Sequence, residues 1–210
     1  MSTFSYTGAH DKTADPYKAA NLENDVSVKD KVNDFGEFVD SCSFAIMTTR
    51  DPASGALFSR CMAVAAKENG GIDLLFYTNN ESGKTREIKS DPNINISFVD
   101  SSGQWASISG NSTIVNDRDI IKKYYSRTLK AWMGDLGDGV HDGGPDDPRF
   151  VIIRVVSNTI IYAITNKNAL TRGIEVAQGA ITGKTPAIHK LREINEVEVR
   201  TWRFSKQVID

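Results

Sequence analysis

The sequence predicts a mainly β fold, an antiparallel barrel with α+β character at its periphery. Short apolar segments with strand character recur along the chain, and tight turns such as Asn69-Gly-Gly71 join them. Helical patterns interrupt them too rarely for a parallel sheet, which needs a crossover connection between each pair of strands. The length of 210 residues fits one domain with extensions.

Helical periodicity first marks residues 28–39, where apolar residues recur every three or four positions. A shorter helix is predicted at residues 82–89, and the Asp-Pro pair that follows should end it. A third apolar stripe keeps a four-residue step from Ile120 to Trp132. We therefore expect one continuous helix there, with its stripe facing the core.

Strand patterns fill the intervals between these helices. The predicted strands are residues 43–49, 56–67, 72–78, 94–100, 105–115, 150–156 and 159–164. Ser157-Asn158 is expected to turn the last two strands into a hairpin, after an acidic, glycine-rich loop at residues 134–148. Further on, residues 170–177 have helical character and residues 195–204 alternate like a strand.

Composition divides the chain into three parts. Residues 1–27 are polar and form an arm, either disordered or draped over a partner. Residues 28–165 carry the barrel pattern. Residues 166–210 form a C-terminal extension that we expect to pack on the barrel or on a dimer partner.

Charge and composition exclude several classes of function. A net charge of -2 provides no basic field for nucleic acid or for an anionic membrane. The apolar runs are too short to span a bilayer, and the N-terminus has no secretory pattern. We therefore expect a cytoplasmic protein. Cys42 and Cys61 match no disulfide or C-x-x-C pattern and are expected to be small buried residues. The scattered histidines predict no metal site.

Residues 59–84 have the composition of an anion site. Ser82 and Lys84 open the predicted second helix, where free backbone N–H groups and the helix dipole favour negative charge. Thr78 ends the strand that leads to this helix, and Arg60 can reach it from a neighbouring strand. A phosphate needs such cations, hydroxyl groups and N–H donors. Each residue taken alone is more simply a solvated side chain or a helix cap.

The order of the motifs resembles the FMN-binding split-barrel family, which includes pyridoxamine 5'-phosphate oxidases and general stress proteins. The resemblance covers about residues 28–164 and rests on Arg60-Cys61-Met62, Phe76-Tyr77-Thr78, Ser82-Gly83-Lys84, Asp91-Pro92-Asn93, Gln104-Trp105, Ser109-Gly110, Tyr124-Tyr125-Ser126 and Ala131-Trp132. With its long tail, the chain looks most like the fungal blue-light-inducible and stress-related branch.

The resemblance implies a set of cofactor contacts. Arg60, Ser82 and Lys84 would hold the phosphate of FMN, and Tyr77 and Thr78 would line the phosphate end. The backbone of Cys61, Met62 and Ala63 would pass along the flavin ring. Gln104 or Trp105, and Trp132, would approach the ring from a second subunit. For Trp132, packing in the core is an equal alternative. FAD or a deazaflavin in the same groove is also an alternative to FMN.

The resemblance also implies a homodimer with the flavin at its interface. The apolar strand around Ile108 and the stripe that ends at Trp132 are the candidate interface elements. A small sheet with open edges favours burying them against a partner.

Function remains open between two classes at this point. The first is an FMN-dependent oxidoreductase or stress-related redox protein, with NAD(P)H as a candidate electron donor. The second is a non-catalytic protein that stores, carries or senses flavin. No residue pattern marks a catalytic acid, base or nucleophile. The family's oxidases carry a C-terminal Arg-x-His pair that grips the substrate, and the sequence has none at residues 200–203. We therefore expect no efficient oxidation of pyridoxamine phosphate.

Overall fold

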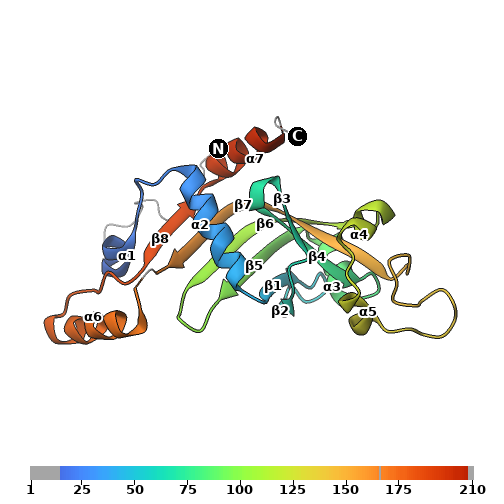
Figure 1. The fold of residues 1–210 in the computed structure, drawn as a ribbon, viewed down its shortest axis with the longest axis horizontal. Coiled ribbons are helices and arrows are strands. Elements are labelled where there is room, and N and C mark those ends of the chain that lie inside the picture. The colour runs from blue at the N-terminus through green and yellow to red at the C-terminus, as the bar shows by residue number, and fades with distance from the viewer. Residues whose placement is uncertain (1–14, 166, 208–210) are drawn as a thin grey trace.

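The computed structural model describes residues 15–165 and 167–207, which form an eight-stranded antiparallel sheet with helices around it (Figure 1). The strands are β1 (Ala45–Arg50), β2 (Leu57–Met62), β3 (Ala66–Glu68), β4 (Asp73–Asn79), β5 (Asn93–Val99), β6 (Trp105–Val115), β7 (Phe150–Ile164) and β8 (Lys190–Ile194). Their order is β2-β1-β5-β6-β7-β4-β3, and β8 also pairs with β7. Although β2 and β3 are consecutive in sequence, they lie at opposite edges, so the sheet is not closed. This is the split-barrel arrangement.

The helices lie outside the sheet, on its covered face and at its ends (Figure 1). They are α1 (Pro16–Asn21), α2 (Val28–Ser41), α3 (Gly83–Ser90), α4 (Arg118–Tyr124), α5 (Thr128–Met133), α6 (Ala169–Thr182) and α7 (Glu196–Gln207), and a 3-10 turn, η1 (Asn69–Gly71), joins β3 to β4. Among the described residues, no helix is both long enough and apolar enough to cross a membrane.

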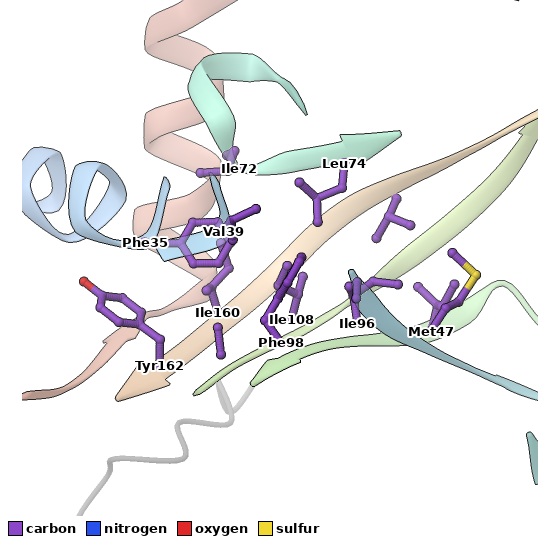
Figure 2. Close-up of a cluster of buried hydrophobic side chains, with 14 of the residues drawn as sticks. Phe35, Val39, Met47, Ile72, Leu74, Ile96, Phe98, Ile108, Ile160 and Tyr162 are labelled. Carbon is purple, nitrogen blue, oxygen red and sulfur yellow. The ribbon is translucent and has the colours of Figure 1, made fainter. Parts of the chain in front are cut away.

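The main core lies between α2 and one face of the sheet (Figure 2). Phe35 of α2 packs against Tyr162 of β7, whose hydroxyl donates a hydrogen bond to the Lys31 carbonyl at 2.8 Å. Met47 of β1 and Ile108 of β6 are fully buried in the same cluster. Because side chains alternate along a strand, the neighbours of Met47 in β1 and of Ile108 in β6 face away from the core.

The final strands differ from the sequence prediction. The predicted hairpin at Ser157-Asn158 is wrong, because β7 runs through it as one 15-residue strand. The Ser157 N–H donates to Asp73 Oδ1 at 2.9 Å and its hydroxyl to the Ile72 carbonyl, which hold this point in the sheet. A register shift opposite, between Ser109 and Gly110 of β6, accommodates the irregularity. A Ser-Asn pair also lacks the glycine that two-residue hairpin turns favour.

The predicted continuous helix ending at Trp132 is also wrong. It breaks at Tyr125, whose backbone is extended and whose hydroxyl donates to the Gly143 carbonyl at 2.9 Å. The Tyr125 ring also packs edge-on against Phe150, at 5.9 Å between centroids. These tertiary contacts turn the chain, so the second half of the stripe leaves the core. Trp132 of α5 is 87% exposed, which rules out core packing for it in this chain.

The C-terminal part contributes to the sheet and to the core. Residues 195–204, predicted as a strand, form α7, and the Asn195 side chain accepts hydrogen bonds from the N–H groups of Val197 and Glu198. Val199 of α7 is fully buried. The predicted strand 56–67 is divided into β2 and β3, which lie at different edges of the sheet.

The described part of the N-terminal arm packs on the same chain. Asn21 of α1 donates to the Pro186 carbonyl and accepts from the His189 N–H. An isolated bridge joins Leu22 to Leu191 of β8. Residues 1–14 of the predicted arm and residues 208–210 of the predicted extension lie outside the described residues.

Candidate functional site

The predicted phosphate residues gather where β4 leads into α3. Thr78 lies near the end of β4, and Ser82 directly precedes the first turn of α3, which contains Lys84. The hydroxyl oxygens of Thr78 and Ser82 are 3.5 Å apart. Arg60 extends from the edge strand β2 toward the same helix, where it contacts Glu87. The structure therefore brings Thr78, Ser82 and Lys84 to the start of α3, and Arg60 to Glu87 in the second turn of the same helix.

Arg60 is already paired with an acidic side chain. Its Nη2 donates to both Glu87 oxygens, at 2.6 and 2.8 Å, and its Nη1 donates to Thr49 Oγ1 at 2.5 Å. The Thr49 hydroxyl in turn donates to Glu87 Oε2 at 2.5 Å. The Glu87 side chain is only 6% exposed. This network connects β2, β1 and α3 and neutralises the charge of Arg60. Sequence reasoning missed Glu87 and Thr49, since neither belongs to a recognisable pattern.

Among the described residues, Lys84 is the cation at this site that no carboxylate contacts directly. Its ammonium group is half-buried and makes no hydrogen bond or ion pair with any described residue. Burial lowers the pKa of Lys84 and the positive charge of Arg60 acts in the same direction, while the nearby charge of Glu87 opposes them without cancelling them. No side chain caps α3 among the described residues, so its first N–H groups retain their donor capacity. An anion bound here would pair with the Lys84 ammonium and accept hydrogen bonds from the first N–H groups of α3.

Tyr77 faces a different part of the molecule. Its ring packs against Phe150 at 5.8 Å between centroids, in a second cluster beneath α4. Its hydroxyl donates to the Ile121 carbonyl at 2.5 Å, and burial raises the pKa of Tyr77 to about 12. The Tyr77 hydroxyl is therefore occupied within the fold. Its predicted place at the phosphate end of a flavin stays a prediction.

The segment predicted to lie along a flavin ring forms the free edge of the sheet. Cys61 and Met62 end β2, which pairs with β1 on one side only, and Ala63 follows. The outer backbone groups of this edge are therefore not used by the sheet. Cys61 is exposed, so the prediction of a buried thiol is wrong for this residue, and Cys42 is half-buried. The register places Cys61 opposite Ile46, on the face away from the core.

The remaining predicted residues do not meet Lys84 within one chain. The Gln104 amide donates to Asp100 Oδ2 at 2.8 Å, and its oxygen accepts from the Thr165 N–H at 2.7 Å. Thr78 pairs with Val151 near the start of β7, whereas Trp105, the first residue of β6, pairs with Ala163 near the end of β7. Thr78 and Trp105 therefore lie toward opposite ends of β7. Trp132 projects from α5 into solvent. Contacts from these three residues to a flavin beside Lys84 depend on a second chain.

Comparison with known proteins settles the family. The model of the family described as "Pyridoxamine 5'-phosphate oxidase like" matches residues 30–187. The chain belongs to this family. It is 57% identical over 203 residues to Protein bli-3 of Neurospora crassa, covering 96% of this chain and 97% of that protein. This match agrees with the fungal blue-light-inducible branch suggested by the sequence motifs.

Solved structures of distant relatives confirm the fold. A putative general stress protein 26 from Jannaschia superposes with a TM-score of 0.60 at 17% identity, covering 80% of this chain and 99% of that one. A protein related to general stress protein 26 from Clostridium acetobutylicum gives 0.54 at 18% identity, covering 65% and 89%. A pyridoxamine 5'-phosphate oxidase-related, FMN binding protein from Nostoc punctiforme gives 0.51 at 13% identity, covering 67% and 85%.

Proposed function

We propose that this protein binds FMN by its phosphate at α3 and acts as a flavin-dependent redox protein. The observation that carries the proposal is the half-buried Lys84, which has no hydrogen bond or ion pair with a described residue, beside a helix N-terminus that no described side chain caps. Membership of a family with an FMN-binding relative supports it. Bound FMN would supply the electron-transfer chemistry, while the protein orients the cofactor and adjusts its electrostatic surroundings.

The described residues fit the phosphate end of FMN. Lys84 would supply the charge, the first N–H groups of α3 would donate hydrogen bonds, and the hydroxyls of Ser82 and Thr78 lie beside them. Arg60 would add positive potential, although Glu87 already takes its hydrogen bonds. The free edge of β2 offers backbone donors and acceptors to the polar rim of the ring.

A matched pair of lysine variants tests the phosphate contact. Lys84→Ala should weaken FMN binding about tenfold or more, because a charge-assisted contact contributes about 1.5–3 kcal/mol. Riboflavin, which has no phosphate, should lose much less affinity. Lys89→Ala, in the exposed last turn of the same helix, is the control. Equal losses for FMN and riboflavin would show that Lys84 supports the fold instead. Mass spectrometry of the released cofactor separates FMN from FAD and deazaflavins.

Turnover separates a redox enzyme from a flavin carrier. In the redox proposal, NADH or NADPH bleaches the yellow absorbance of the FMN-loaded protein in the absence of oxygen, and oxygen restores it. A carrier or sensor keeps its absorbance under the same conditions. FMN binding and reduction by NADH or NADPH are measured separately. Either the binding proposal or the redox proposal can therefore fail while the other holds.

Pyridoxamine phosphate is a poor candidate substrate, because the C-terminal arginines are already paired. Arg203 donates to both oxygens of Asp73, and Arg200 pairs with Glu196 one turn earlier. A second phosphate needs its own cations, or its desolvation opposes binding. A kcat/KM above about 10⁴ M⁻¹s⁻¹ for pyridoxal phosphate formation, the low end of ordinary enzymes, would contradict this part of the proposal.

We propose a homodimer for the same molecule. The strand around Ile108 was one candidate interface element from the sequence, and Ile108 itself is buried in the core of the chain. The opposite face of the sheet instead exposes Phe44 and Ile46 at β1 and Val99 at the end of β5. Exposed apolar groups of this kind often mark an interaction site. Light scattering should give about twice the chain mass of 23.1 kDa.

A further inference from the structure

A cavity of about 450 Å³ lies where the end of β1 and the start of β2 meet the segment after α3 and the middle of β6. Thr48, Asn95 and Ser109 line it from three paired strands, on the face of the sheet away from the core. None of the residues assigned above to FMN is among its described lining residues. Its volume is in the range of sites for small molecules, about 300–1,000 Å³. The cavity is therefore a second candidate site of the molecule.

Arg50, at the end of β1, supplies this cavity with a cation. It is exposed and makes no hydrogen bond or ion pair with any described residue. By contrast, Arg60, Arg154 and Arg203 each donate two hydrogen bonds to a carboxylate. A guanidinium with unused donors matches a phosphate group, which it binds through two parallel hydrogen bonds. The cavity therefore has a point of contact for a phosphate.

Asp91 adds a hydrogen-bond acceptor to the same cavity. Its Oδ1 accepts from the N–H and the side-chain amide of Asn93, at 3.1 and 2.7 Å, while its Oδ2 accepts nothing from a described residue. These hydrogen bonds lower the pKa of Asp91 against a smaller effect of burial, and the positive charge of Arg50 adds to the lowering. An ionised carboxylate accepts hydrogen bonds from hydroxyl groups but repels a second anion. Together, Arg50 and Asp91 favour a phosphate ester with a neighbouring hydroxyl group over a free phosphate ion.

The outer face of β2 connects this cavity with the segment proposed for the flavin ring. Leu57 lines the cavity and is 71% exposed, which provides an apolar surface for an aromatic base. Ser59 and Cys61 follow on the same face of the strand. Cys61 lies about 13 Å along β2 from Leu57. A molecule that contacts both the cavity and the flavin ring is therefore elongated, with a base and a phosphate at the end that enters the cavity.

We propose that the cavity binds the adenosine half of NADPH, with Arg50 holding its 2′-phosphate and Asp91 accepting from the adjacent ribose hydroxyl. The proposal rests on the redox part of the proposed function and names its electron donor. In dinucleotide-binding folds, an acidic residue accepts from a ribose hydroxyl of NAD, and an arginine accommodates the 2′-phosphate of NADP. Leu57 contacts the base, and the row through Ser59 leads toward the flavin ring proposed at Cys61. NADH lacks the 2′-phosphate, so the cavity discriminates against it.

Nucleotide fragments test the site without any flavin reduction. Adenosine 2′,5′-bisphosphate carries the phosphate that Arg50 is proposed to hold, whereas adenosine 5′-monophosphate does not. Titration calorimetry with the two fragments therefore isolates this contact. The parent protein should bind the bisphosphate about tenfold or more tightly than the monophosphate. Similar affinities for the two fragments, or no binding of either at millimolar concentration, would overturn the proposal.

A matched pair of arginine variants assigns the contact to Arg50. Arg50→Ala should bring the affinity for the bisphosphate close to that for the monophosphate, because it removes the cation and breaks no contact of the fold. Arg127→Ala is the control. Arg127 is also exposed and makes no side-chain hydrogen bond or ion pair with a described residue, but it directly precedes α5 and does not line the cavity. Equal losses of bisphosphate affinity in the two variants would overturn the proposal.

Kinetics separate this inference from the proposed function. In the FMN-loaded parent protein, KM should be about tenfold or more lower for NADPH than for NADH, and Arg50→Ala should remove this difference with little change in kcat. Equal KM values for the two donors, with FMN reduced by each, would overturn this inference and leave the redox proposal intact. Fragment binding that depends on Arg50, in a protein whose FMN neither donor reduces, would support the nucleotide site and overturn the redox proposal.

Discussion

At the scale of single residues, the candidate site depends on Glu87, which no sequence motif marked. Glu87 holds the Arg60 guanidinium with both carboxylate oxygens, while Lys84 contacts no described carboxylate directly. The sequence indicated an anion site because Ser82 and Lys84 open a helix and Arg60 could reach them from a neighbouring strand. It could not indicate that a buried carboxylate would neutralise one of them.

The substitution Glu87→Gln separates stability from anion affinity. Without the carboxylate, Arg60 and Lys84 repel one another, so the free energy of unfolding should fall by about 1–3 kcal/mol. FMN should bind several-fold more tightly, since its phosphate then interacts with two uncompensated cations. Urea unfolding and fluorescence titration measure the two effects. Glu81→Gln, an exposed position just before α3, is the control. Unchanged or weaker FMN binding would argue against a phosphate at this site.

His189 makes the attachment of α1 sensitive to pH. Its Nδ1 lies 2.9 Å from the Tyr17 hydroxyl, and its Nε2 is buried without a partner among the described residues. Burial lowers the pKa of His189, and the positive charge of Arg172 lowers it further. The folded state therefore favours neutral His189. Its contribution is complete above the unfolded pKa of about 6.5 and is lost as the pH falls through the lower folded value.

Unfolding at two pH values tests this assignment. The free energy of unfolding should fall between pH 7.5 and pH 5.5, with at most about 1.4 kcal/mol per pH unit from this one group. In His189→Asn, which can keep a hydrogen bond to Tyr17 but does not titrate, the fall should be smaller. An identical pH dependence in both proteins would place the titrating group elsewhere.

At the scale of elements, the periodicity of apolar residues predicted the correct type of element wherever one face packs on the core. Helix α2 and the strands β1, β4, β5 and β6 have the expected type and nearly the expected bounds. The errors lie where tertiary contacts override local pattern. Ser157 is held inside β7 by Asp73 and Ile72, and α7 forms because Asn195 caps it and Val199 enters the core. These partners are distant in sequence or weak as local signals.

Substitution of alanine for two different glycines should change the stability of the protein in opposite directions. A Cβ on Gly110, at the irregular point of β6, would lie 2.4 Å from the Val156 carbonyl oxygen, so Gly110→Ala should destabilise the protein by about 1–3 kcal/mol. A Cβ on Gly36 of α2 meets nothing within 4 Å. Gly36→Ala should therefore stabilise it by about 0.4–1 kcal/mol. Urea unfolding of both variants is the measurement, and the same sign for both would contradict the structure.

At the scale of the whole molecule, the candidate site could be predicted only in part. Thr78, Ser82 and Lys84 come together because the short connection between β4 and α3 places them at the start of this helix, and Arg60 reaches the same helix from β2. Gln104, Trp105 and Trp132 lie elsewhere in the chain, and one sequence carries no information on the symmetry that could unite them. The antiparallel pairing of the strands followed from their short length and the tight turns between them, but the contribution of β8 and α7 to the fold did not.

The pairing of the long strand β7 determines how its backbone amides exchange with solvent. Along most of its length β7 is bonded to β6, and its other edge is covered by β4 over its first half and by β8 over its last residues. An amide flanked on both sides cannot reach solvent deuterium by local fraying. Hydrogen exchange at Ile152 and Tyr162 should therefore require unfolding of the entire domain. Both probes should report one free energy, although they lie near opposite ends of the strand, while the amides of α6 exchange far sooner. If β7 instead exchanged in two separate kinetic classes, the two ends of the molecule would be independent cooperative units.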